Sequence, residues 1–185
     1  IQNHDQLKQN FSFLNSETLV HTHADLIVGL PGETLESFAK GFDELYELKP
    51  DEIQVGILKR LRGTPIIRHN ELFQMKYHVQ PPYHILSNKD LDFTTVQRMQ
   101  RFAKFWDLIA NSGNFKDTMK LIEKCHPTSL FAVFLEMTDF LSLRHPKRHS
   151  IALLTLTESL WLFLTEQKAL PTNVVRDAII QDYTI

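Results

Sequence analysis

The feature that most constrains the fold is the order of hydrophobic patterns in the first third of the chain. Residues 19–29 (LVHTHADLIVG) form a mostly apolar run that ends at a glycine, which is typical of a buried strand. Residues 35–45 place apolar side chains at i, i+3, i+4, i+7 and i+10, as an amphipathic helix does. Residues 53–58 (IQVGIL) form a second apolar run. This order predicts a βαβ unit with two parallel strands and a right-handed crossover.

The ends of the expected helix are marked by polar residues and a proline. Thr34 is the expected N-cap, because its hydroxyl can accept a hydrogen bond from an amide of the first turn. Glu33 and Glu36 suit the positive end of the helix dipole. Pro50 cannot continue a helix, so we expect the helix to stop before it.

The rest of the chain is predicted to be mainly helical. A first helix is expected over residues 5–14, and residues 63–92 contain the glycine and prolines of an irregular connection. Thr94 and Gln97 have the spacing of a capping box, and the helix that follows should end at residues 111–113. Further helices are expected near residues 114–124, 128–143, 150–167 and 172–182. Those near 128–143 and 150–167 are apolar nearly all round and should lie at the centre of a small bundle.

Composition excludes several classes of protein. The 185 residues carry 20 Lys and Arg against 22 Asp and Glu, a net charge of −2, which gives no reason to expect nucleic-acid or anionic-membrane binding. Cys125 is the only cysteine, so this chain cannot hold a disulfide framework, a four-cysteine zinc site or a complete cysteine-ligated iron–sulfur cluster. The longest apolar stretch, residues 151–164, is interrupted by polar residues and is shorter than the ~18 residues of a membrane span. We therefore expect no membrane span and a cytoplasmic location.

The segment ADLIVGLPGET, residues 24–34, is the most informative about function. It runs from a buried strand through a turn with two glycines and a proline to a helix N-terminus, where backbone and amides can approach an anion closely. It contains neither the Gly-Lys-Ser/Thr of a phosphate loop nor the Gly-x-Gly-x-x-Gly of a dinucleotide-binding turn. On spacing alone, a plain βα turn and a ligand site are equally compatible with it.

Longer stretches carry a resemblance to a known family. DLIVGLPGET (25–34) and KPDEIQVGILKRLRGTP (49–65) resemble the later barrel strands of radical S-adenosylmethionine (SAM) enzymes. The type that they resemble most also has a cobalamin-binding domain and includes magnesium-protoporphyrin monomethyl ester oxidative cyclases and Fe–S oxidoreductases. PPYHILSNKDLDF (81–93) and NSGNF (111–115) resemble the C-terminal domain of one branch of that family. The likeness covers nearly the whole chain.

The sequence departs from the family at one decisive place. The family's Cys-x-x-x-Cys-x-x-Cys loop, which holds the [4Fe–4S] cluster, is absent, and the chain opens at Ile1. The resemblance therefore implies the C-terminal portion of a longer parent that would bind SAM, the cluster and, in the cobalamin-dependent type, cobalamin. This chain alone should hold no cofactor, have no catalytic residue and be inactive, and its partner would be the remainder of its own parent chain. The resemblance identifies no substrate.

The same resemblance assigns binding residues. Asp25 would hydrogen-bond a polar part of SAM, and Ile27, on the same strand face, would pack on adenine. Gly29 would let the backbone pass close to the ligand. Leu58 and Lys59, at the end of the next strand, match positions whose backbone atoms meet adenine. The implied fold is α/β plus α: residues 1–62 are a partial parallel βα barrel with two or so strands, 63–92 an irregular connection and 93–185 a helical bundle that covers the barrel.

Two other functions remain open. His21 and His23 alternate with Asp25 on one strand face, as metal ligands of barrel hydrolases do, but they lie at the N-terminal end of the strand, whereas barrel sites lie at the C-terminal end. We therefore predict no metal site, and keep a metal-dependent hydrolase as an alternative. The other alternative is a protein-interaction module. A partial barrel would also leave strand edges unpaired, so we expect association into a dimer or a larger assembly.

Overall fold

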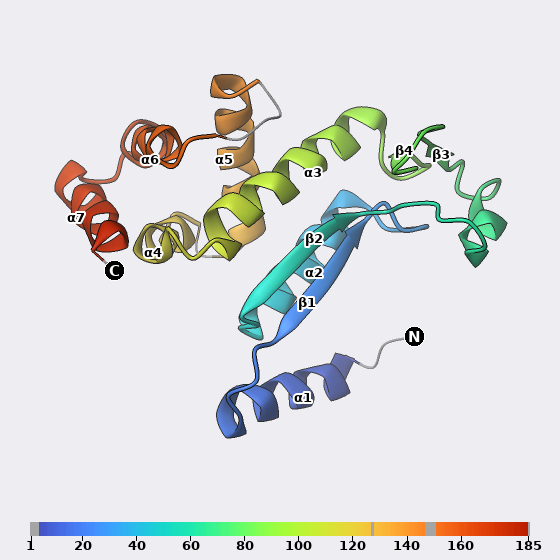
Figure 1. Cartoon of the computed structure of the whole chain (residues 1–185), viewed down its shortest axis with the longest axis horizontal. Helices are drawn as coiled ribbons and strands as arrows, with labels where there is room; N and C mark the ends of the chain where they lie inside the picture. Colours follow the sequence, from blue (N-terminus) through green and yellow to red (C-terminus); the bar gives the residue numbers. More distant parts are fainter. Residues whose placement is uncertain (1–3, 127, 147–150, 185) are drawn as a thin grey trace. The chain divides into compact units, whose positions relative to one another are not determined.

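A computed structural model describes residues 4–126, 128–146 and 151–184. The chain forms two compact units, Ile1–Ala103 and Lys104–Ile185. Figure 1 shows their elements in sequence order, from α1 near the N-terminus to α7 near the C-terminus.

The first unit contains the predicted strand–helix–strand segment. After α1 (His4–Glu17) come β1 (His23–Val28), α2 (Leu35–Glu47) and β2 (Glu52–Ile57). The strands pair in parallel, with Asp25 opposite Gln54 and Ile27 opposite Gly56. The parallel pairing is thus confirmed, although β1 is shorter than the apolar run that predicted it. Among the described residues this sheet has two strands and closes no barrel.

Local sequence explains where α2 begins and ends. The amide of Ser37 donates to the Thr34 hydroxyl at 3.2 Å, and the amide of Thr34 donates to the Ser37 hydroxyl at 2.9 Å. This reciprocal pair is a capping box, so the prediction of Thr34 as N-cap is confirmed. The helix ends at Glu47, and Lys49 then adopts a φ of +52°, which turns the chain toward Pro50 and β2.

The two faces of the β1–β2 pair have different surroundings. One face carries the buried side chains of Ala24, Val28, Ile53 and Val55, and α2 lies along the strands in Figure 1 and buries Phe38, Phe42 and Leu45. On the other face, the side chains of His23, Asp25, Ile27 and Gln54 are exposed. We call this second side the open face. A strand pair needs apolar cover on one side only, so the open face is free to carry polar chemistry.

The connection after β2 is more ordered than predicted. It contains the short 3₁₀-helix Pro65–His69 and a small antiparallel pair, β3 (Lys76–Tyr77) and β4 (Ile85–Ser87). The amide of Ile85 donates to the carbonyl of Leu58 at 2.8 Å, so the hairpin returns to the end of β2.

Helix α3 (Phe93–Trp106) begins with a cap that the sequence analysis missed. The side chain of Asp92 accepts from the amide of Thr95 at 2.7 Å, and its carbonyl accepts from Val96 at 3.0 Å. The predicted capping box of Thr94 and Gln97 is therefore wrong, because Asp92 occupies the N-cap position and Thr94 lies inside the helix. A π-helical segment, Asp107–Asn111, then leads to Gly113, and the expected end at 111–113 is confirmed.

The second unit contains the remaining helices: α4 (Lys116–Lys124), α5 (Leu130–Arg144), α6 (Leu153–Leu162) with a π-helical continuation (Phe163–Gln167), and α7 (Thr172–Tyr183). Helix α5 is buried along most of its length, as its apolar composition predicts. The first turn of α6 is instead exposed at Leu153 and Leu154, and its expected start at residue 150 lies outside the described residues. In the part of the chain that is described, no helix combines the length and apolar character needed to cross a membrane.

Helix α4 is capped by a residue from the end of the chain. The Asp182 carboxylate of α7 accepts from the amides of Asp117 and Thr118 at 2.6 and 3.0 Å, and from the Thr118 hydroxyl at 2.6 Å. Because the first amides of a helix have no partner within it, this carboxylate supplies what the local sequence of α4 lacks. The contact ties α7 to α4.

Candidate functional site

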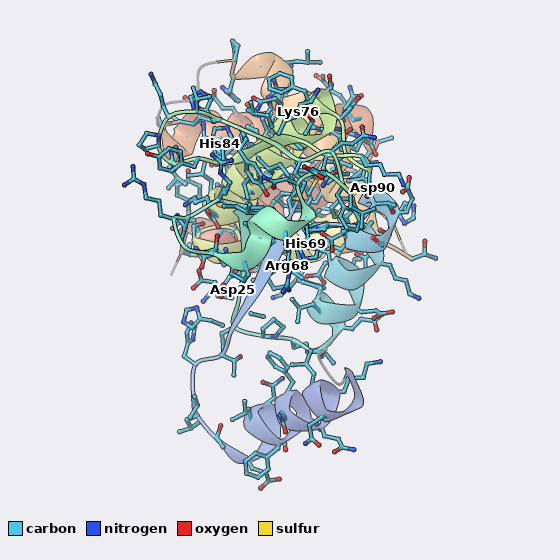
Figure 2. All side chains as sticks on the ribbon, turned by 90° about the vertical axis from the view of Figure 1, so that its right-hand side faces the viewer. Asp25, Arg68, His69, Lys76, His84 and Asp90 are labelled. Carbon is cyan, nitrogen blue, oxygen red and sulfur yellow. The ribbon has the colours of Figure 1, made fainter. Side chains whose placement is uncertain are left out.

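Asp25 and Ile27 lie on the open face of β1. The Asp25 side chain is exposed and Ile27 is 41% exposed, so both side chains are accessible on this face. The residue opposite Ile27 is Gly56, which has no side chain to cover it. A carboxylate beside an uncovered apolar side chain can bind a ligand that has both a polar and a planar apolar part. The structure thus brings these two predicted residues together, and Asp25 is labelled in Figure 2.

Gly29 is required by the packing of the protein itself. Its φ is +95°, and a Cβ atom there would lie 2.7 Å from Cγ2 of Ile85. The Asn88 side chain also donates to the Gly29 carbonyl at 3.2 Å. The glycine is therefore explained by the close approach of the connection, and its role toward a ligand stays a prediction.

Leu58 is also engaged by the connection. Its amide donates to Val28 at 3.0 Å and its carbonyl accepts from Ile85 at 2.8 Å, so both backbone groups already have partners. Lys59 has an exposed side chain and forms an isolated antiparallel bridge with His84. Both residues directly follow β2, which ends at Ile57.

Glu33 is a candidate residue that the sequence analysis interpreted differently. Its carboxyl group is half-buried, and Oε2 has no hydrogen-bond partner among the described residues. Burial raises the pKa of Glu33 to about 7. It lies directly before the N-cap Thr34, where the sequence analysis placed it, but its burial was not expected. An acid that titrates near neutrality can exchange a proton, and no feature of the GLPGET pattern alone indicates that burial.

The connection supplies further polar groups near this end of the unit. The Asn70 Oδ1 and Asp90 Oδ2 atoms are buried and, within the described ranges, have no hydrogen-bond partner. A Cβ atom at Gly32 would lie 3.3 Å from the Phe73 ring, so the turn that follows β1 packs against the connection. Figure 2 labels further polar residues of the connection: Arg68, His69, Lys76, His84 and Asp90. Sequence reasoning did not predict that the connection packs against this turn, because the segment has little hydrophobic periodicity.

A second cluster lies at the opposite, N-terminal end of β1. His21 and His23 share a side, as predicted, and their rings meet edge to face with centroids 4.6 Å apart. Glu52 of β2 joins them, with Oε2 3.0 Å from Nδ1 of His23. Sequence reasoning missed Glu52, because only the register between the two strands, which the structure supplies, places it opposite His23.

Other side chains singled out by type have ordinary surroundings. Cys125 is half-buried, its thiol donates to the Leu121 carbonyl, and burial raises its pKa, so it is not an activated nucleophile. In the basic segment 59–62, the Arg60 guanidinium lies over the Tyr77 ring, 5.3 Å from its centroid. That contact gives Arg60 a packing role.

Comparison with known proteins assigns the C-terminal part of the chain to a family. The fold is α/β followed by a helical unit, and a family model described as a protein of unknown function, DUF4080, matches residues 71–185. The match covers more than half of the chain, so the chain belongs to the DUF4080 family. No curated protein matches the chain. The matched region begins after β2 and excludes Asp25, Ile27, Gly29, Leu58 and Lys59.

Proposed function

We propose that this chain is the C-terminal part of a radical SAM enzyme of the cobalamin-binding type, and that the open face of β1 and β2 forms part of the wall that binds SAM. The observation that carries the proposal is the exposed pair Asp25 and Ile27, one carboxylate and one apolar side chain on one face of a parallel strand. The turn that follows, with Gly29 at a φ of +95°, matches the motif on which the family resemblance rests.

The side chains fit the chemistry of SAM. The Asp25 carboxylate offers acceptors for an amine or for ribose hydroxyls, and Ile27 offers an apolar surface for adenine. Leu58 and Lys59 would line the C-terminal end of the neighbouring strand. Gly29 would let the backbone of the turn pass close to the ligand.

The residues of this chain do not fit an iron–sulfur cluster. A [4Fe–4S] cluster is held by cysteine thiolates, and the sequence contains only Cys125, which is half-buried in the helical unit. The cluster of the parent enzyme would therefore depend on cysteines outside these 185 residues. The part that this chain plays is to bind and orient SAM.

The test uses the intact parent protein. Replacing the Asp25 carboxylate in an Asp25→Asn variant should raise the Kd for SAM about 10- to 100-fold, because a hydrogen bond to a charged group contributes roughly 1.5–3 kcal/mol. Asp177→Asn is a matched control, since Asp177 is an exposed aspartate of α7 that pairs with its neighbour Arg176. Equal Kd values for the wild type and Asp25→Asn would contradict the proposal.

A further inference from the structure

Three potential metal ligands meet at the N-terminal edge of the β1–β2 pair. One ligand atom from each of His21, His23 and Glu52 lies within 4.8 Å of the other two. We propose, against the sequence-based prediction of no metal site, that this trio, two imidazoles and one carboxylate, binds a divalent transition-metal ion of the zinc class. The inference goes beyond the proposed SAM site and does not rest on it, because the trio lies at the other end of the strands.

The backbone under the trio is held by hydrogen bonds between Thr22 and Asp51. Thr22 is 6% exposed, and its amide and hydroxyl both donate to Asp51 Oδ2, at 2.7 and 2.9 Å. The amide of Asp51 donates in return to the Thr22 hydroxyl at 3.1 Å. His21 and His23 are both exposed, and their rings lie edge to face with centroids 4.6 Å apart. The cross-strand partner of His23 is Glu52, so the third ligand is set by the register.

The separations suit one ion after small side-chain movements. Zinc binds imidazole nitrogen and carboxylate oxygen at roughly 2.0–2.2 Å, so two ligands of a tetrahedral ion lie about 3.3 Å apart. Nδ1 of His23 and Oε2 of Glu52 are already 3.0 Å apart. The side chain of His21 is 62% exposed and that of His23 57%, so both rings have room to rotate toward a common centre.

The ligand types determine which ions fit. Imidazole nitrogen favours Zn²⁺, Ni²⁺, Cu²⁺ and Co²⁺, whereas Mg²⁺ and Ca²⁺ require mostly oxygen ligands. The Asp51 carboxylate lies 3.7 Å from Nδ1 of His21 and adds negative charge near the ion, while its oxygen stays bonded to Thr22. Three protein ligands leave a fourth position for water or for a further ligand. An ion held here would bridge β1 and β2.

The test is a Zn²⁺ titration of the 185-residue chain, prepared without an affinity tag and treated with chelator. Calorimetry should show one saturable ion per chain, the thermal midpoint should rise with Zn²⁺, and Co²⁺ should give visible absorption bands of a low-coordinate site. Neither Mg²⁺ nor Ca²⁺ should bind at the same concentration. His23→Ala and Glu52→Gln should each raise the Kd at least about tenfold, the size of effect that even outer-shell changes produce. His126→Ala, which removes an exposed histidine of the second unit, should leave the Kd unchanged.

Two results would overturn the proposal. One is the absence of saturable Zn²⁺ binding to the wild-type chain. The other is binding that persists with the wild-type Kd in both His23→Ala and Glu52→Gln. Glu52→Gln preserves the shape of the side chain, so far-ultraviolet circular dichroism that matches the wild type assigns a loss of binding to the ligand rather than to the fold.

Discussion

The half-buried carboxyl group of Glu33 should make the stability of the first unit depend on pH. Burial moves its pKa from 4.5 to about 7, so the folded state holds the proton more tightly than the unfolded state does. Between these two values the folded state binds more protons, and the free energy of unfolding therefore falls as pH rises. The loss of stability caused by ionising the half-buried carboxyl group is absent below pH 4.5 and fully present above about pH 7.

The size of this effect follows from the displacement of the pKa. At 1.36 kcal/mol per pKa unit, the change from 4.5 to about 7 corresponds to about 3 kcal/mol for a carboxyl group shielded from water. Glu33 is only half-buried, and solvent screening reduces this to about 1–2 kcal/mol. Glu33→Gln removes the charge and keeps the shape. We expect the variant to gain about 1–2 kcal/mol relative to the wild type between pH 4.5 and pH 8.

The assay must report on the first unit. Both tryptophans, Trp106 and Trp161, belong to the second unit, so their fluorescence would follow the wrong transition. Hydrogen exchange of peptides that cover β1 is suitable, and a comparison at equal pH cancels the intrinsic exchange rate. The measured quantity is the amide protection of Glu33→Gln divided by that of the wild type. This ratio should be roughly 5- to 30-fold larger at pH 8 than at pH 4.5.

The matched control is Glu36→Gln, which should change stability at pH 8 in the opposite direction. Glu36 is exposed, and hydrogen bonds from its own backbone amide and from Thr34 lower its pKa. A carboxyl group with a lowered pKa stabilises the folded state at pH values above its ordinary pKa, and this stability is lost on acidification. Glu36→Gln should therefore lose amide protection at pH 8. A protection ratio for Glu33→Gln that stays constant from pH 4.5 to pH 8 would refute the reasoning.

Three further predictions concern packing, capping and binding. Gly29→Ala should destabilise the first unit by about 2–4 kcal/mol, measured by hydrogen exchange of β1, because the added Cβ would clash with Ile85 and the backbone φ is unfavourable for alanine. Gly63→Ala has open space around the added Cβ and should cost only about 1 kcal/mol. Equal costs at the two glycines would contradict this account. Asp182→Ala should lower the stability of the second unit by about 2–3 kcal/mol, because three hydrogen-bond donors of α4 lose their acceptor. Urea unfolding followed by tryptophan fluorescence measures this change. An unchanged urea midpoint would argue against the capping role. The isolated 185-residue chain should bind SAM negligibly, and micromolar binding in calorimetry would show that the rest of the barrel is not needed.

The parts of the fold that could be predicted are those in which neighbouring residues determine the result. Helix α2 is one, because its apolar spacing and the Thr34 cap lie within one short segment. The parallel pairing of β1 with β2 is another, because a helix of that length between two strands requires a crossover.

Long-range contacts explain what the sequence analysis missed. The connection forms the antiparallel pair of β3 and β4, and Ile85 bonds to Leu58, 27 positions earlier; no local pattern indicates either contact. The cap of α4 comes from Asp182 on another helix, and the burial of Glu33 depends on the folded surroundings of the turn. The start of α3 was missed for a local reason, since Asp92 and Thr94 are both good capping residues and the sequence does not decide between them.

The candidate site was predicted in part. The shared face of Asp25 and Ile27 follows from strand parity alone. Glu52 was missed because its proximity to His23 depends on the register between two strands, which a single sequence does not specify. The reason for Gly29 was also missed, because the atom that excludes a side chain belongs to Ile85.

The sequence of the native polypeptide on the N-terminal side of Ile1 tests the central claim most directly. If the open face of β1 and β2 is one wall of a SAM site, the native polypeptide should contain a Cys-x-x-x-Cys-x-x-Cys loop ahead of this segment. A native polypeptide that lacks any such three-cysteine loop would contradict the account, and Asp25 and Ile27 would then need a different explanation.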